Sequence, residues 1–350
     1  MSASPQHTPG SSATPALRRS ADGSAPRGTA DRPCATARFE PVTAHLVVAL
    51  VALVVIGGAT RVMDAGLACP DWPLCYGQWL PGGRMNLQVF LEWFHRLDAF
   101  LVGVALLVLS AASWLGRRDL PPWLPRCCSA ALLLVALQGA LGALTVTRLL
   151  APGVVTAHLG TALLLVALVS GVHQALERER LSSGSVRSIS SHVQSQLPPW
   201  WRGLALLALV LVLVQCVLGG SLASQWAADR CIAAAEGCQW LLRHRVAATP
   251  AALSVAALLP AALALPAAER HLRWFAAAAA LLAVLQVSLG VATLRLQLAV
   301  PAVTVAHQLV AALLVALLGA MAGRSLLART RSIHPGGDPA FNPSVQSAHG

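Results

Sequence analysis

Apolar runs of about 20 residues recur along this chain, and each could cross a hydrocarbon core of about 30 Å. Backbone polar groups must be satisfied internally in lipid, so we expect each run to form a helix. Only 11% of the residues are charged, against about 25% in ordinary soluble domains. The sequence therefore predicts an all-α integral membrane protein with eight transmembrane helices. The expected spans are 42–62, 92–115, 127–147, 153–175, 201–223, 243–265, 272–294 and 301–323.

Arginines predict the orientation, because short cytoplasmic loops carry an excess of Lys and Arg. They precede the first span, lie between spans 2 and 3, 4 and 5, and 6 and 7, and follow the last span. We expect a multi-pass protein of the cell (inner) membrane with both termini cytoplasmic and loops 63–91 and 224–242 outside. Residues 1–41 and 324–350 are expected to be cytoplasmic tails, the first of them disordered. No hydrophobic signal segment precedes Pro41, so we expect the first span to be retained.

The net charge of +11 does not indicate a nucleic-acid-binding protein. The arginines lie in tails and short connections, and they do not form one amphipathic face with interleaved aromatic residues. We expect the partner of this surface to be the lipid bilayer, and we expect no nucleic acid.

The chain contains an internal repeat. Residues 138–145 (QGALGALT) match residues 286–293 (QVSLGVAT), and Pro152 and Pro301 each stand six residues before a histidine. Four spans per repeat is an even number, so the halves should share one orientation. We expect two side-by-side, pseudo-symmetric four-helix bundles, covering 42–175 and 201–323.

Four histidines occupy repeat-related positions in the first turns of the even-numbered spans. An ionisable residue inside a span is costly and therefore a functional candidate. Imidazole binds iron, copper and zinc alike, but an interior of Gly, Ala, Leu and Val suits a flat apolar macrocycle better than a bare ion. Two axial histidines in each half would then hold one haem. The four are His95, His158, His244 and His307.

Charged residues beside these histidines are further candidates. Arg96 and Arg245 follow two of the ligands directly, and either pair with haem propionates or snorkel toward lipid headgroups. Glu92 lies three residues before His95 and should share its helix face, whereas the second half has Leu241 at that place. Glu92 is therefore a candidate proton handler for one site only; the alternative is a solvated residue favoured by the helix dipole.

Two cysteine pairs lie at equivalent places in the outward loops. Disulfides persist on that oxidising side of a membrane, so we expect Cys69–Cys75 and Cys231–Cys238 to form. The second is expected to be a structural staple. For the first, a redox role and a structural role both remain open, and zinc binding lacks a complete ligand set.

Together these motifs resemble the haem A synthase family. The resemblance rests on Gly-Gly-Ala-Thr-Arg61, Asp-Trp-Pro-Leu-Cys75-Tyr-Gly, Glu92-Trp-Phe-His95-Arg96, Thr-Ala-His158 and Val-Ala-His307-Gln, and it covers about 42–323. It implies an oxidoreductase that converts the C8 methyl of haem O to a formyl group through a hydroxymethyl intermediate. The product is haem A for terminal oxidases.

The resemblance also implies roles for the residues. The first-half histidines would hold haem O as substrate, and the second-half pair would hold a haem b that relays electrons. Glu92 and the Cys69/Cys75 pair would take part in activity, and Cys231–Cys238 would be a disulfide. The implied partners are haem O synthase (the protohaem farnesyltransferase) and an electron donor, and a homo-oligomer is possible.

Two other functions compete with this interpretation. A dihaem b-type quinol or ferric reductase would share all four histidines, but Glu92 in one half only and the loop motif argue against it. A transporter would place polar residues near the bilayer midplane, and the predicted spans have no mid-span charges.

Overall fold

The computed structural model describes residues 36–185, 197–227 and 239–327. This part of the chain contains eight helices that are long and apolar enough to cross a membrane. The predicted number and type of spanning elements is therefore confirmed. The helices are α1 (Phe39–Val62), α2 (Leu87–Leu115), α3 (Trp123–Thr147), α4 (Pro152–Ser185), α5 (Pro199–Ala227), α6 (Gln239–Leu263), α7 (Arg270–Arg295) and α8 (Pro301–Leu326).

The start of α2 differs from the prediction. The Asn86 side chain accepts a hydrogen bond from the Val89 N–H at 2.9 Å and caps the helix, which therefore begins at Leu87 and not at residue 92. His95 consequently lies in the third turn of the helix. At the other end, α4 continues to Ser185, beyond the predicted limit of 175. A helix has no need to stop where the hydrocarbon ends.

The turns after α3 and α7 have the same backbone conformation. Leu149 and Leu150 have positive φ angles, as do Gln297 and Leu298. The N–H of Leu150 donates to the Thr145 carbonyl at 2.8 Å, and the N–H of Leu298 donates to that of Thr293 at 3.1 Å. These bonds satisfy orphan carbonyls at each helix end. The sequence repeat thus produces a repeated local structure here, while the pseudo-symmetry of the whole halves stays a prediction.

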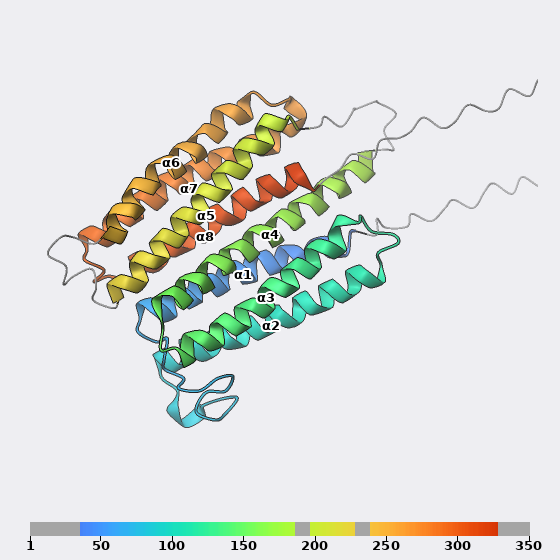
Figure 1. The fold of residues 1–350 in the computed structure, drawn as a ribbon. Helices are drawn as coiled ribbons and strands as arrows, with labels where there is room; N and C mark the ends of the chain where they lie inside the picture. The colour runs from blue at the N-terminus through green and yellow to red at the C-terminus, as the bar shows by residue number, and fades with distance from the viewer. Residues whose placement is uncertain (1–35, 186–196, 228–238, 328–350) are drawn as a thin grey trace, which may run out of the picture. The chain divides into compact units, whose positions relative to one another are not determined.

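Each group of four consecutive helices closes a ring of contacts. In the first group, α1–α2, α2–α3, α3–α4 and α1–α4 are in contact; in the second, α5–α6, α6–α7, α7–α8 and α5–α8 are. The two groups meet through α4, α8, α1 and α5, and the α4–α8 contact is the most extensive (Figure 1). Helix α8 is the most enclosed: 56% of its apolar 18-residue stretch is buried, against 11% of the corresponding stretches in α3 and α7.

Small residues allow α4 and α8 to approach closely. A Cβ added at Gly319 would lie 2.5 Å from the Ala167 carbonyl oxygen, and one added at Gly323 would overlap the backbone of Gly171. The Ser170 hydroxyl donates to the Ala316 carbonyl across the same contact at 2.7 Å. Gly319 and Gly323 form a Gly-x-x-x-Gly pattern, which brings membrane helices together through backbone contact.

A buried ionic cluster adjoins this contact. Arg178 of α4 and Arg324 of α8 both pair with Glu269, at 3.3 and 3.6 Å. The Arg178 guanidinium also donates to the Arg324 carbonyl at 2.8 Å. Glu269 ends the short helix η2 (Ala267–Glu269), so this cluster ties the α6–α7 connection to both central helices.

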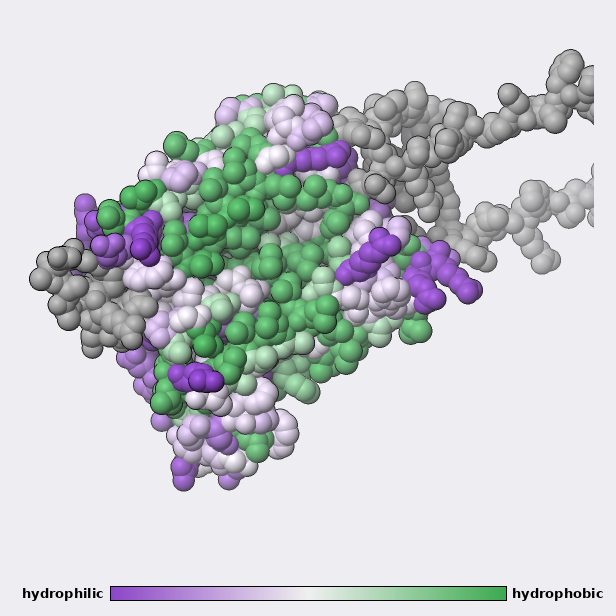
Figure 2. Space-filling view, in the orientation of Figure 1, coloured by the Kyte–Doolittle hydropathy of each residue, from purple (hydrophilic) through white to green (hydrophobic). Residues whose placement is uncertain are grey.

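The helices expose an apolar surface. Large hydrophobic side chains such as Leu133, Leu281, Val48 and Phe100 are at least 65% exposed. On the face drawn in Figure 2, hydrophobic residues cover the middle of the helices and hydrophilic ones gather toward their ends. A patch of this extent identifies a lipid-facing surface, so this is a multi-pass membrane protein.

Candidate functional site

Two of the predicted ligands face each other inside the first group of helices. The rings of His95 on α2 and His158 on α4 have centroids 6.5 Å apart and planes inclined at 81°. Two metal–imidazole bonds of about 2 Å each, with the two ring radii added, span roughly 6 Å. The pair therefore has the separation that one shared metal centre requires.

Each of the four histidines lies against a glycine of the preceding helix. A Cβ at Gly57 would stand 2.8 Å from the His95 Cε1. For the pairs Gly142–His158, Gly219–His244 and Gly290–His307 the same distance would be 3.7, 3.0 and 3.1 Å. At Gly57, Gly219 and Gly290 a Cβ would crowd the ring, whereas at Gly142 it would make an ordinary contact. Three of the odd-numbered helices therefore supply a recess that only glycine leaves open. The pairs are Gly57–His95, Gly142–His158, Gly219–His244 and Gly290–His307.

The second glycine of each Gly-Gly pair faces the other group of helices. A Cβ at Gly58 would overlap the side chain of Gln308, and one at Gly220 would lie 2.8 Å from Leu159 Cδ2. Gln308 and Leu159 are each the residue directly after a candidate ligand. The Gly-Gly pairs therefore position a histidine within one group of helices and pack against the ligand helix of the other.

Glu92 is buried and joins α2 to the outward loop. Its Oε2 accepts a hydrogen bond from the Cys69 N–H at 2.8 Å, and its Oε1 accepts one from Arg96 Nη2 at 2.5 Å. The side chain of Glu92 is only 6% exposed. It is therefore not the solvated helix-start residue considered as the alternative.

Arg96 binds the same loop through its backbone carbonyls. Its guanidinium donates to the carbonyls of Asp71 and Leu74 at 2.6 Å each, and to that of Cys69 at 3.3 Å. With Glu92 included, four acceptors surround this one side chain. In this structure Arg96 holds the loop, and its predicted pairing with a haem propionate or a lipid headgroup stays a prediction.

The loop is closed by the predicted Cys69–Cys75 disulfide. Both cysteines are buried, with 0% and 1% exposure. The Asp71 carboxylate accepts hydrogen bonds from the N–H groups of Gly77 and Tyr76 at 2.7 and 2.6 Å. These bonds, that from Gly77 foremost, lower the pKa of Asp71. The disulfide and this turn present a preformed loop to Glu92 and Arg96.

The corresponding part of the second half is chemically simpler. Arg245 has an exposed side chain, and the neighbouring Arg243 lies over the Trp240 ring at 4.9 Å. Leu241 occupies the position equivalent to Glu92. Cys231 and Cys238 lie outside the described residues, so their predicted disulfide stays a prediction.

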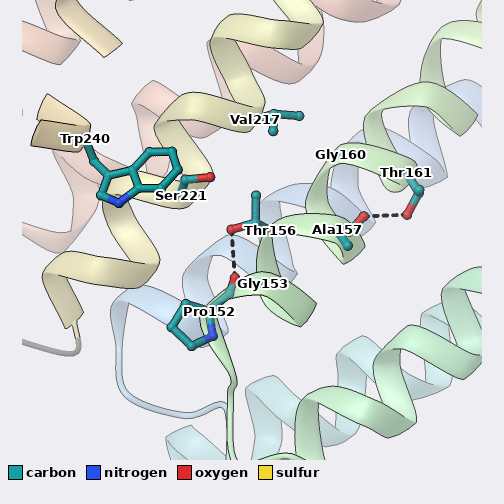
Figure 3. A pocket seen from close by; sticks show the side chains of 9 residues that line it. All are labelled: Pro152, Gly153, Thr156, Ala157, Gly160, Thr161, Val217, Ser221 and Trp240. Carbon is teal, nitrogen blue, oxygen red and sulfur yellow. Dashed lines mark hydrogen bonds between the residues drawn. The ribbon is translucent and has the colours of Figure 1, made fainter. Parts of the chain in front are cut away.

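A cavity of about 500 Å³ opens where α4, α5 and α6 meet (Figure 3). It lies between the two groups of helices, on the face of α4 that carries Ala157 and Gly160 beside His158. The hydroxyls of Thr156 and Thr161 donate hydrogen bonds to the carbonyls of Pro152 and Ala157 on the same helix. The lining thus presents mostly apolar surface.

The donor set fits haem better than a bare ion. Among the described residues, no group of three or more His, Cys, Asp or Glu side chains is placed to hold a metal ion. The Nδ1 atoms of His95 and His307 are buried without a hydrogen-bond partner in the described part of the chain. Paired imidazoles in an apolar interior are suited to the two axial positions of a haem.

A sequence profile of the cytochrome oxidase assembly protein family (COX15-CtaA) matches residues 42–318, which include all four histidines and the Glu92 loop. This chain belongs to that family. The match runs from the first turn of α1 into α8, which agrees with the resemblance found from the motifs.

Curated relatives of this family member carry informative names. The Heme A synthase of Shewanella oneidensis is 34% identical over 200 residues, covering 52% of this chain and 56% of the relative. That of Caulobacter vibrioides is 33% identical over 222 residues, covering 53% and 61%. The chain thus spans little more than half the length of these relatives. A Protoheme IX farnesyltransferase of Halobacterium salinarum is 32% identical over 77 residues, covering 22% and 16%.

Sequence reasoning missed the glycines that receive the rings in this family member. The Gly-Gly-Ala-Thr-Arg61 motif includes Gly57, and the repeat includes Gly142 and Gly290, but none of these glycines was predicted to lie against a histidine. A usable signal was present, because each glycine follows Leu or Ile and ends a five-residue pattern that recurs in all four odd helices. The partner ring on the next helix cannot be read from that pattern alone.

Proposed function

We propose that this protein is a haem A synthase, which oxidises the C8 methyl of haem O to a formyl group through a hydroxymethyl intermediate. The observation that carries the proposal is the His95–His158 pair, whose ring centroids are 6.5 Å apart. His95 lies on α2, the helix that also bears the Glu92–Arg96 ion pair, and His158 lies on α4. The family membership and the names of the curated relatives support the same activity.

The first half is the proposed substrate site. His95 and His158 would hold haem O, whose iron supplies the oxidative chemistry when it is bound. Glu92 is the proposed proton handler, because it is a buried carboxylate one turn from His95. Arg96 would orient it through the ion pair, and the Cys69–Cys75 loop would cover this end of the site and keep water out.

The second half is the proposed electron-transfer site. His244 and His307 would hold haem b, each beside its own glycine. The absence of a carboxylate at Leu241 supports a haem that relays electrons without reacting. Arg245, whose side chain is exposed, is the proposed partner of a propionate of this haem.

The surroundings of the protein follow from the same proposal. We place it in the cell (inner) membrane with both termini cytoplasmic and the Cys69–Cys75 loop outside, from the arginine distribution. Haem O synthase is the proposed donor of the apolar substrate. A stretch of this chain is similar to part of a protein named Protoheme IX farnesyltransferase, which supports a link to the same pathway. An electron donor completes the proposed set of partners.

Variants of the ligands test the division of labour. The full-length protein, made in cells that also make haem O, is purified and its haems are extracted and weighed. We expect His158→Ala to remove haem O and its oxidised products while haem b is retained, and His307→Ala to remove haem b. If the wild type contains no haem O and both variants lose haem b, the result would indicate the dihaem reductase instead.

A further inference from the structure

Three arginines from three helices gather at one end of the contact between the two groups of helices. Arg178 lies near the end of the membrane-crossing part of α4, which runs to Leu181. Arg324 lies in the last turn of α8, and Arg202 lies in the first turn of α5. These helix ends are on the side that the arginine distribution predicts to be cytoplasmic.

One carboxylate lies among these guanidinium groups. Glu269 Oε1 is 3.3 Å from Arg178 Nη2, whereas Glu269 Oε2 is 3.6 Å from Arg324 Nε, which is too long for a hydrogen bond. Each of these three side chains is only 7% exposed. Two buried guanidinium groups thus share one carboxylate, and its pairing with Arg324 is loose.

Arg202 adds a third positive charge to this cluster. It lies close enough to Arg178 for the two like charges to repel each other. Its Nε atom is buried with no hydrogen-bond partner among the described residues, and the same is true of the Arg324 Nε. The cluster of Arg178, Arg202, Arg324 and Glu269 therefore combines three positive charges with one negative charge.

Two further carboxylates of α4 have partners of their own. Glu177 accepts a hydrogen bond from the Gln174 amide at 2.6 Å, and Glu179 accepts one from the Trp123 indole N–H at 3.2 Å. Neither is among the described groups whose charges act on Arg178. These carboxylates therefore do not balance the positive charge of the cluster.

The rest of the chain supplies little negative charge at this end. Segments 186–196 and 328–350 adjoin these helices in the sequence and lie outside the described residues. Together they contain one acidic side chain, Asp338. Burying positive charge without a matching negative charge is costly, and an anion from outside the chain would offset this cost.

Large apolar side chains flank all three arginines and are partly exposed. Leu181, Trp200 and Leu326 each lie within three residues of one arginine, and they are 46%, 49% and 47% exposed. A tryptophan at a helix end is typical of the interface between membrane and water. Acyl chains would pack against these side chains, whereas a soluble anion would gain nothing from them. The surroundings of the cluster therefore favour a lipid as the source of the anion.

We propose that Arg178, Arg202 and Arg324 bind the phosphate of an anionic phospholipid, such as cardiolipin or phosphatidylglycerol. Guanidinium groups match the geometry of phosphate oxygens. Basic pockets between membrane helices on the cytoplasmic side bind headgroups of this kind. The bound lipid would tie α4, α5 and α8 together, and these helices join the two groups. The inference does not depend on which haems the protein binds.

Thermal unfolding of the full-length protein in a neutral detergent measures the effect of the lipid. We expect added cardiolipin to raise the unfolding temperature, because a ligand that binds only the folded state stabilises it. Phosphatidylcholine, whose headgroup has no net charge, should have a smaller effect. Inorganic phosphate tests the soluble anion. A shift from phosphatidylcholine or inorganic phosphate as large as that from cardiolipin would overturn the assignment to an anionic lipid.

Arg202→Gln separates a lipid site from a structural ionic cluster. Without added lipid this variant should be at least as stable as the wild type, because it removes a like charge beside Arg178. Its apparent affinity for cardiolipin should fall about 10-fold or more, as expected when a hydrogen bond to a charged group is lost. Arg118→Gln is the matched control, because Arg118 is an exposed arginine in the α2–α3 connection. Equal cardiolipin affinities in the two variants would overturn the proposal.

Native mass spectrometry provides a readout that does not depend on unfolding. The wild type and Arg118→Gln should retain a bound anionic phospholipid after the detergent is removed, and Arg202→Gln should lose it. Arg324→Gln should lose it as well, since the Arg324 guanidinium is proposed to contact the same phosphate. Retention of the lipid in both Arg202→Gln and Arg324→Gln would contradict the site.

Discussion

Arg96 and Glu92 lie one turn apart on α2 and form an ion pair of 2.5 Å that faces the disulfide loop. Glu92 also accepts the Cys69 N–H at 2.8 Å, so a single carboxylate joins the helix that bears His95 to the Cys69–Cys75 loop. The proposed proton handler is thereby also a structural anchor, and its variants should separate these two roles.

Glu92→Ala should loosen the loop. Loss of a charge-assisted hydrogen bond costs about 1.5–3 kcal/mol, so hydrogen exchange at the Cys69 amide should quicken about 10- to 100-fold. Exchange in α8 should not change. Glu92→Gln keeps an acceptor for that N–H and should show a smaller effect. Exchange mass spectrometry on the detergent-solubilised protein measures both, and an unaltered Cys69 amide in Glu92→Ala would contradict the anchoring role.

Gly57→Ala should weaken the first haem site. The added Cβ would come 2.8 Å from the His95 Cε1, so the ring must move. Overpacking of this kind costs about 1–3 kcal/mol, or about 5- to 150-fold in affinity. The readout is the amount of each haem per purified chain. Gly103→Ala is the matched control, because its Cβ meets nothing within 4 Å. Equal haem content in the two variants would contradict the claim that Gly57 leaves room for the His95 ring.

Gly323→Ala should destabilise the contact between the two groups of helices. Its Cβ would overlap the backbone of Gly171, and backbone cannot move aside as a flexible side chain does. We expect a loss of about 1–3 kcal/mol in the free energy of unfolding, measured by titrating detergent-solubilised protein with SDS. Gly203→Ala on α5 meets nothing within 4 Å and serves as control. A Gly323→Ala protein as stable as this control would contradict the close approach of α4 and α8.

The covering loop should loosen in acid. The hydrogen bond from the Gly77 N–H lowers the pKa of Asp71 in the folded loop. A carboxylate with a lowered folded pKa stabilises the fold above its unfolded pKa of about 3.9, and this contribution disappears as the pH falls through the folded pKa. Phosphine reduction of the Cys69–Cys75 disulfide should therefore quicken below about pH 4. Asp71→Asn should remove that part of the pH dependence, and an identical profile in this variant would exclude Asp71 as the cause.

The spans and the histidines could be predicted from the sequence because their signals are local. Length and hydropathy alone predict a spanning helix, and the four histidines stand out through the repeat. The Cys69–Cys75 disulfide was also predictable, since two nearby cysteines in an outward loop have few other partners. The start of α2 at Leu87 was missed although Asn86 is a common capping residue.

The role of Arg96 could not be predicted in the same way. Three of its four acceptors are backbone carbonyls between Cys69 and Leu74, and a carbonyl has no sequence signature. The contact also depends on how the loop folds back over the end of α2. The recess at Gly57 has the same origin, because the ring it receives lies on a different helix.

Haem O is the proposed substrate of this protein, and the haems that the purified protein carries test this proposal. The full-length protein is purified from cells with haem O synthase and from matched cells without it, and its haems are extracted and identified by mass. We predict haem b in both preparations, and haem O, its hydroxymethyl derivative or haem A only in the first. Haem b alone in both, at about two per chain as two bis-histidine sites would hold, would contradict the proposed activity.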